Sequence, residues 1–123
     1  MRGRWGSWGT LAVVLSLAAP ASPALAHARL IESEPAHRAA LKAAPKQVRL
    51  TFNSLVEQRF VRLTLTGAGG QAHPLIHAPK QPGQARVLVI PLPALRPGAY
   101  RLTWSVVSAD GHRVEGAIAF SIR

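Results

Sequence analysis

Apolar and polar residues alternate one by one along several short stretches of this chain. The alternation covers 48–52, 61–66, 100–106 and 118–122, while 86–92 has strand character and is apolar on both faces at its centre. A period of two is typical of β-strands that bury one face and leave the other in solvent. Short strands recur between turn signals, and no stretch has a convincing helical pattern. The sequence therefore predicts an all-β fold, an antiparallel sandwich or barrel.

One turn sharpens this prediction. The segment 95–100 reads Leu-Arg-Pro-Gly-Ala-Tyr and leads directly into the alternating stretch 100–106. Such a sequence is typical of the corner of a Greek-key sandwich, where a tyrosine hydroxyl bonds to the backbone a few residues upstream. We therefore expect Tyr100 to make that bond. Trp104, on the same face of the strand, is expected to be a core residue.

The segments between the strands have weaker patterns. An extended start to the domain ends at Pro35, and 67–70 is expected to be a turn. The alanine-rich stretch 36–44 favours a helical turn that Pro45 stops. The segment 71–84 carries three prolines and two histidines, so we expect an irregular polar loop there.

The first 26 residues are typical of a secretory signal peptide. Two arginines precede a short apolar run, and Ala24 and Ala26 are the small residues of an A-x-A cleavage site. The apolar run is too short to cross a bilayer comfortably. We therefore expect residues 1–26 to be removed on export, leaving one domain, 27–123, whose first residue is His27.

Composition excludes several classes of function. The chain has no cysteine, which removes thiolate catalysis, iron–sulfur clusters and thiolate zinc sites, and its only methionine is Met1. It has 15 Lys and Arg against 5 Asp and Glu, a net charge of +10. Nucleic-acid binding is nevertheless not expected, because the arginines are scattered singly without a basic run or interleaved aromatic residues.

Two segments carry residues that suit a metal ion. Cleavage after Ala26 would give His27 a free α-amine, and this amine and the imidazole Nδ1 can close a six-membered ring on one ion. Asp110-Gly111 is a hairpin-turn signal, but in an extended segment Asp110 and His112 would point to the same face. The four groups together would form an N,N,N,O set, which suits Cu(II). From spacing alone, a turn with a solvated histidine remains an equal alternative.

Both ends of the expected domain resemble the periplasmic copper-binding CopC family. The likeness rests on His27-Ala28-Arg29-Leu30 with Ser33, Pro35-Ala36, Leu41, Ala44-Pro45, Val48, Leu50 and Phe52, and on Tyr100-Arg101-Leu102-Thr103-Trp104 and Val106-Val107-Ser108-Ala109-Asp110-Gly111-His112 to Gly116. It implies a small Greek-key β-barrel, cupredoxin- or immunoglobulin-like, that binds Cu(II) through the N-terminal amine, His27, Asp110 and His112. It also implies the handling of exported copper in the periplasm, beside an inner-membrane partner of the CopD type.

The chain departs from the two-site members of this family in two places. Those members carry a methionine-rich loop for Cu(I), whereas 67–84 has no methionine and offers His73 and His77 instead. We expect these two histidines to be solvated and the domain to hold one copper site. Asn53 stands where some members have an acidic residue, with Glu57 beyond it, so an accessory carboxylate near copper is not expected.

The leading hypothesis for function is a monomeric, non-enzymatic Cu(II) carrier or buffer of copper resistance or homeostasis. An oxidative copper enzyme is the first alternative, since an N-terminal histidine brace also occurs in polysaccharide monooxygenases. Those enzymes are generally larger, and an anionic ligand such as Asp110 would oppose the Cu(I) state that must meet oxygen. A metal-free, immunoglobulin-like interaction module is the second alternative.

Overall fold

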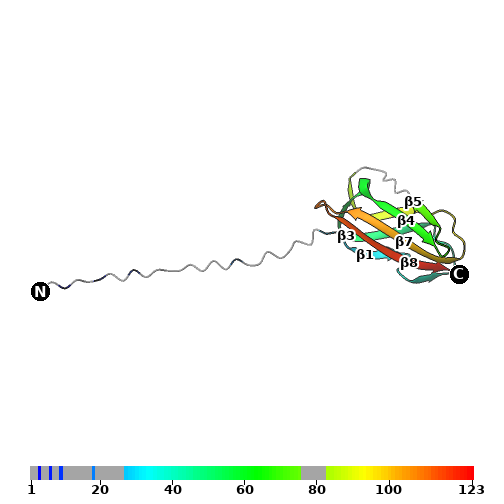
Figure 1. Cartoon of the computed structure of the whole chain (residues 1–123), viewed down its shortest axis with the longest axis horizontal. Helices are drawn as coiled ribbons and strands as arrows, with labels where there is room; N and C mark the ends of the chain where they lie inside the picture. The colour runs from blue at the N-terminus through cyan, green and yellow to red at the C-terminus, as the bar shows by residue number, and fades with distance from the viewer. Residues whose placement is uncertain (1–2, 4–5, 7–8, 10–17, 19–26, 76–82) are drawn as a thin grey trace.

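The computed structural model describes residues 27–75 and 83–123, together with residues 3, 6, 9 and 18. The expected signal peptide lies almost entirely outside the described residues, and so does His77. Within the part of the chain that is described, no helix is long and apolar enough to cross a membrane. Figure 1 shows the described domain as a set of strands that run roughly along one long axis.

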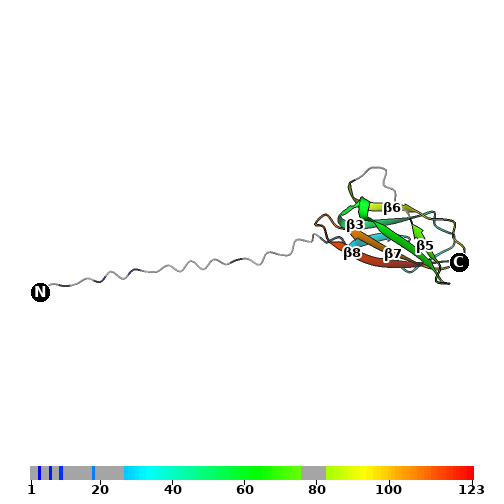
Figure 2. The same ribbon diagram turned by 45° about the horizontal axis from the view of Figure 1, so that its top comes forward.

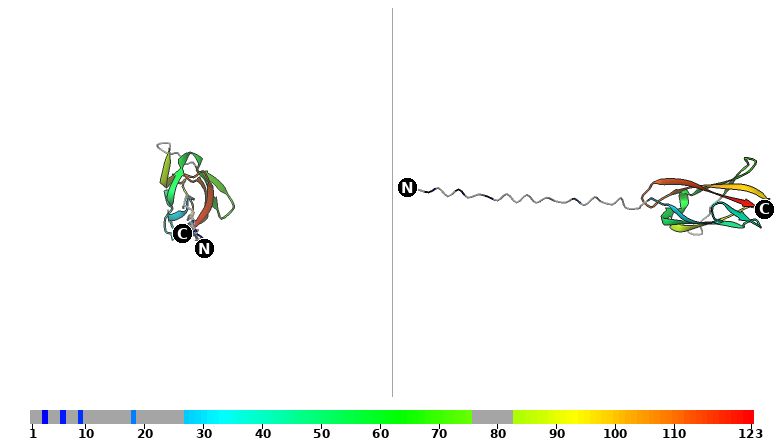
Figure 3. Two further views of the ribbon diagram at one scale, coloured as in Figure 1. Left: turned by 90° about the vertical axis from the view of Figure 1, so that its left-hand side faces the viewer. Right: turned by 90° about the horizontal axis from the view of Figure 1, so that it is seen from below.

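The strands form two sheets that pack face to face, as the end-on view on the left of Figure 3 shows. In chain order the elements are β1 (Leu30–Glu34), β2 (Ala39–Leu41), β3 (Gln47–Glu57), the 3-10 turn η1 (Gln58–Phe60), β4 (Arg62–Gly67), β5 (Ala72–Leu75), β6 (Gln84–Pro91), β7 (Gly98–Val107) and β8 (Arg113–Ile122). One sheet has the order β1-β3-β6 and the other the order β2-β8-β7-β4-β5. The expectation of an all-β sandwich is confirmed.

Alternation along the strands builds the core between the two sheets. On β7, Leu102, Trp104 and Val106 are buried while their neighbours face outward. The Trp104 ring packs edge-to-face on Phe52 of the other sheet, with ring centroids 5.2 Å apart. The remaining buried apolar side chains are Ala28, Val48, Leu50, Val56, Leu63, Leu65, Leu88, Ile90, Ile118, Phe120 and Ile122. Trp104 is therefore a core residue, as expected.

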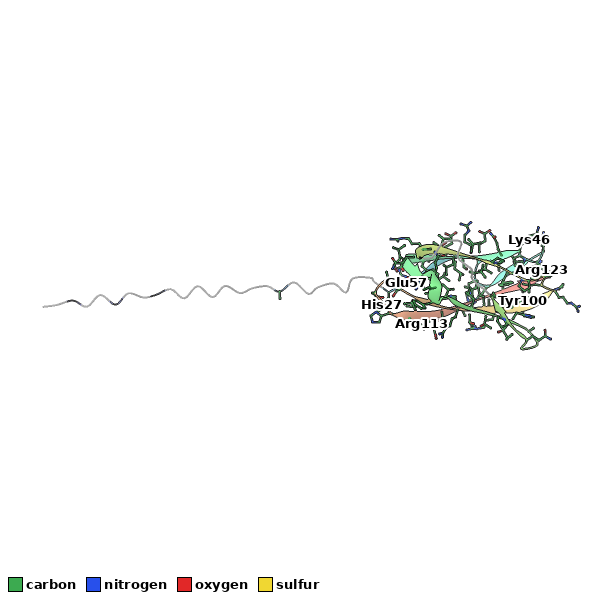
Figure 4. The ribbon with its side chains drawn as sticks, turned by 90° about the horizontal axis from the view of Figure 1, so that it is seen from above. His27, Lys46, Glu57, Tyr100, Arg113 and Arg123 are labelled. Carbon is green, nitrogen blue, oxygen red and sulfur yellow. The ribbon has the colours of Figure 1, made fainter. Side chains whose placement is uncertain are left out.

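The corner before β7 is also confirmed. The Tyr100 hydroxyl donates a hydrogen bond of 2.7 Å to the carbonyl oxygen of Arg96. The Tyr100 ring stacks on Phe120 of β8 at a centroid distance of 5.7 Å. This corner lies at the end of the sandwich that also carries the C-terminus, where Figure 4 labels Tyr100.

Two segments differ from the expectation. The alanine-rich stretch 36–44 forms no helical turn but contains strand β2, which pairs in parallel with the end of β8. Two hydrogen bonds fix the start of β2. The amide of Ala119 donates to His37 Nδ1, and the amide of Arg38 donates to the Ala119 carbonyl. Pairing with an existing strand thus overrides the helical preference of alanine.

The second difference lies in the expected loop 71–84. Its first part forms β5, which pairs with β4 and places Pro74 opposite Thr64. A proline cannot donate to the ladder, and it is tolerated here because β5 is the outermost strand of its sheet. Figure 2 shows β5 and β6 in the two different sheets.

Candidate metal centre

The turn between β7 and β8 holds the Asp-Gly-His sequence in a defined conformation. The amide of Gly111 donates a hydrogen bond to the Ser108 carbonyl, and the amide of Ser108 donates one to the His112 carbonyl. The donor–acceptor distance is 2.9 Å in each. Gly111 has a φ of +87°, a left-handed conformation that glycine adopts without the cost of a side chain. The turn expected from Asp-Gly is therefore present.

Asp110 folds back over this turn and organises it. Its Oδ1 accepts a hydrogen bond from the Ser108 hydroxyl and another of 3.2 Å from the His112 amide. Ser108 is fully buried, so its hydroxyl is a fixed donor beneath the carboxylate. Bonds from the Ser108 hydroxyl, and then from the side chain and amide of His112, hold the pKa of Asp110 well below its usual range, against a smaller opposing effect of desolvation. Asp110 is thus ionised at neutral pH.

The other oxygen of Asp110 faces two imidazoles. Oδ2 lies 2.9 Å from Nδ1 of His112 and 3.6 Å from Nδ1 of His27. The two imidazole rings meet edge-to-face with centroids 4.7 Å apart. One possible ligand atom from each of the three residues lies within 4.8 Å of the others.

The N-terminal segment reaches the turn because it is anchored on β3. Asn53 accepts a hydrogen bond of 2.7 Å from the Arg29 amide through its side chain, and its own amide donates to the Arg29 carbonyl over 2.9 Å. Ala28 is buried in the core at 2% exposure. These two anchors follow His27 immediately, so they fix where its backbone enters the domain.

The β7–β8 turn is tied to the same part of β3. The Ala109 amide donates a hydrogen bond of 3.1 Å to the Leu55 carbonyl, and Val56 forms an isolated bridge with Ser108. The last residues of β3 therefore serve as a common support for His27 on one side and the turn on the other. Figure 4 shows His27 at this end of the sandwich, away from the end that carries Lys46 and Arg123.

The three side chains suit a divalent ion that prefers nitrogen and oxygen ligands. Both histidines are 65% exposed and Asp110 is 22% exposed, so an ion can reach the group from solvent. The carboxylate lies between two imidazoles, so an ion could contact an oxygen of Asp110 and a nitrogen of each histidine. Imidazole and carboxylate suit Cu(II), and thiolate or thioether ligands that select Cu(I) are missing from this set.

The structure thus brings together His27, Asp110 and His112, the three side chains singled out in the sequence. Asp110 and His112 meet through a turn stabilised by the Asp110 side chain rather than through the alternation of an extended strand. His73 lies on β5 opposite Leu65 and is not part of this group. Glu57 accepts a hydrogen bond from Gln84 and is also not part of it.

Two supporting residues escaped the sequence reasoning. Ser108 belongs to the motif of the turn, and the structure shows that it is also the buried donor to Asp110. Asn53 offers no carboxylate, but it anchors the segment that carries His27. The available signal for Ser108 was a hydroxyl two residues before an aspartate at a turn, an arrangement in which the short polar side chains bond locally.

Comparison with known proteins connects this geometry to a family. Residues 30–123 match the CopC domain family. The chain belongs to the CopC family. The match includes Asp110 and His112, whereas His27 lies just before its first residue.

Several named relatives of this CopC-family chain are copper proteins. It is 33% identical over 124 residues to copper resistance protein C of Xanthomonas campestris pv. juglandis, covering 95% of this chain and 96% of that one. It is 33% identical over 122 residues to copper transport protein CutJ of Bacillus subtilis, covering 98% of this chain but 22% of CutJ. Protein YobA of Escherichia coli K12 is 35% identical over 99 residues, or 80% of each chain.

Solved structures of CopC-family proteins have the same fold. CopC from Methylosinus trichosporium OB3b superimposes with a TM-score of 0.68 at 28% identity, over 78% of this chain and 93% of that one. PcoC from Escherichia coli superimposes with a TM-score of 0.62 at 30% identity, over 80% of this chain and 100% of that one. PcoC is described as a methionine-rich copper resistance protein, whereas this chain has one methionine, Met1.

Proposed function

We propose that this protein is a periplasmic Cu(II)-binding protein that carries or buffers copper. Its ligands are the imidazoles of His27 and His112, the carboxylate of Asp110, and the α-amine that His27 gains when residues 1–26 are removed. The observation that carries the proposal is the meeting of donors from two segments far apart in sequence. One possible ligand atom from each of the three side chains lies within 4.8 Å of the others.

The proposed fourth ligand depends on processing. Residues 1–26 have the composition of a secretory signal, and cleavage after Ala26 would convert an amide nitrogen into an amine. An amine is a far better ligand than an amide nitrogen that has not lost its proton. Because Ala28 and Arg29 are anchored on the domain, the new terminus would begin one residue before a fixed point.

The ligand chemistry supports Cu(II) rather than Cu(I). Three nitrogens and one oxygen favour a tetragonal Cu(II) site, and neither cysteine nor an internal methionine is available for Cu(I). A carboxylate held ionised by Ser108 further stabilises the higher charge of Cu(II). This preference supports a carrier over an oxidative enzyme, whose copper must be reduced before it meets oxygen.

A membrane partner of the CopD type fits a carrier of exported copper. In CutJ, a named copper transport protein, a region similar to this chain accounts for 22% of a much longer polypeptide. A domain of this kind thus works there as part of a larger copper transport protein. We propose that the present chain acts as a monomer in the periplasm and exchanges copper with such a partner.

The experiment compares two forms of the protein that differ by one residue. One begins at His27, and the other keeps Ala26 before it. Each is titrated with Cu(II) in competition with a chelator of known affinity, after its N-terminus has been verified. We expect the form that begins at His27 to bind one Cu(II) at least about 100-fold more tightly, a difference of about 2.7 kcal/mol. Equal affinities would remove the α-amine from the site and would contradict the proposed ligand set.

A further inference from the structure

Exposed apolar and basic side chains lie beside the three candidate ligands. Leu55 and Phe60 are large apolar residues that are 37% and 49% exposed. The Leu55 carbonyl accepts from the amide of Ala109, the residue before Asp110. Arg113, the residue after His112, donates a hydrogen bond of 3.4 Å from Nη1 to the carbonyl oxygen of Phe60.

Three arginines lie close to η1 in the sequence or the fold. Arg113 also donates to the Ser105 hydroxyl over 2.7 Å, and Arg62 is the ladder partner of Ser105 on the other side. Arg59 is in η1, directly before Phe60, and is exposed. We call the set Leu55, Arg59, Phe60, Arg62 and Arg113 the arginine–phenylalanine surface. Figure 4 shows Arg113 and His27 at the same end of the molecule.

The charge of this surface is not used within the domain. Among the described residues, no arginine or lysine forms an ion pair with a carboxylate, so Arg59 and Arg62 have no carboxylate partner. Glu115, opposite Ser105 on β8, is the nearby acidic residue of the ladder and offsets part of the charge. Positive charge beside a cation site opposes cation binding. Retention of copper therefore does not explain these arginines.

We propose that the arginine–phenylalanine surface docks an acidic protein partner that exchanges copper with the adjacent site, a role that rests on the proposed function. Exposed aromatic and arginine side chains are the residue types enriched in protein interfaces. Complementary charge would raise the rate of encounter and orient the partner with its ligands toward the copper. A second copy of this chain is a poor occupant, because it would bring the same arginines and the same excess of basic over acidic residues.

The test uses a labelled acceptor peptide with two histidines, four glutamates and two leucines. Its affinity for the copper-free protein is measured by fluorescence anisotropy, so docking is measured without any copper chemistry. A matched peptide replaces each glutamate with lysine, and another replaces each leucine with serine. We expect the acidic peptide to bind at least about tenfold more tightly than the lysine peptide at low salt. This preference should decline as salt shortens the range of the charges.

Two double variants with the same change in net charge locate the effect. Arg59→Glu with Arg62→Glu should abolish the preference for the acidic peptide. Lys46→Glu with Arg123→Glu, at the opposite end of the molecule in Figure 4, should leave it in place. Phe60→Ser should remove the advantage of leucine over serine in the peptide. Unfolding curves of all variants check that each still folds.

Three results would overturn the proposal. Equal losses in the two double variants would mean that only net charge matters, and no loss in either would mean that the surface is not used. Binding to phosphatidylglycerol vesicles that depends on Arg59 and Arg62, without any preference for the acidic peptide, would assign the surface to a membrane.

Copper transfer from loaded protein to the acidic peptide is then timed by stopped flow. Peptide docking without Cu(II) uptake by the protein would contradict the proposed function and leave the docking surface standing.

Discussion

Replacing Gly116 with alanine should destabilise the domain by forcing a side chain against Trp104. Gly116 lies opposite Trp104 in the β7–β8 ladder, and the indole covers the place where a side chain would be. An ideal Cβ there would lie 2.6 Å from Cε2 and 3.0 Å from Cη2 of Trp104, inside ordinary contact distance. The ring would have to move by about 1 Å, and Phe52 packs against it in the core.

The expected cost follows from this overlap. Overpacking a core usually costs about 1–3 kcal/mol, and a rigid ring held by a second aromatic residue belongs at the upper end. The loss of glycine's freedom in the unfolded chain returns about 0.4–1 kcal/mol. We therefore expect a net loss of about 2 kcal/mol, or a fall in Tm of about 8–16 °C for a domain of this size.

Urea unfolding followed by circular dichroism measures this change as a shift of the midpoint at constant slope. Gly69→Ala is the matched control, because nothing lies within 4 Å of its Cβ position. In a Trp104→Leu background the cost of Gly116→Ala should fall by at least about 1 kcal/mol, since the overlapping ring is gone. A loss below about 0.5 kcal/mol, or an equal loss in both backgrounds, would refute the packing argument.

Three further predictions concern the site and the corner. His112→Ala should weaken Cu(II) binding about 100-fold in a competition titration. The urea midpoint of the copper-free domain should change little, because this side chain is 65% exposed. Unfolding of the copper-free variant would instead indicate a structural role for His112. Tyr100→Phe removes the hydrogen bond to Arg96 and should therefore lower the free energy of unfolding by about 0.5–1.5 kcal/mol. The copper affinity should not change. A loss of copper binding would show that the corner and the site are coupled. Cu(II) affinity should fall between pH 7.5 and 5.5 as protons compete for the α-amine. Asp110, whose pKa is held well below its usual range, stays ionised throughout. Asp110→Asn should therefore lower the affinity without removing this pH dependence.

The strands could be predicted where one face is buried. The stretches 48–52 and 100–106 alternate because each second residue enters the core, and both lie within observed strands. The alternation could not show where a strand ends, because a strand can continue past its last alternating residue. β3 runs on to Glu57 past a register shift, and this irregular end supports the candidate site.

Edge strands were not predictable from local sequence. β2 consists of Ala39–Leu41 and exists because β8 offers an unpaired edge. β5 contains Pro74, which argues against a strand unless the strand is the outermost one. In both cases the strand forms because it pairs with a segment that is distant in sequence. Local sequence patterns carry no information about that pairing.

The candidate site was predictable in its members but not in its construction. Asp110 and His112 could be paired from their spacing, whereas the approach of His27 was inferred from a family resemblance, because it depends on tertiary contacts. The bonds of Asn53 to Arg29 and of Ser108 to Asp110 decide where these side chains stand. Their roles follow from the fold and not from any motif.

The position of the site also bears on how the domain resists unfolding. His27 precedes the first strand and His112 precedes the last one, so an ion bound to both would join two positions that are 112 − 27 = 85 residues apart in the sequence. In a protein without cysteine, that ion would be a removable link between two distant segments, present in the folded domain and lost when it unfolds. Each tenfold excess of ligand over its dissociation constant adds about 1.4 kcal/mol to the stability of the bound form. Loaded and empty molecules would thus differ in lifetime against proteases as well as in cargo.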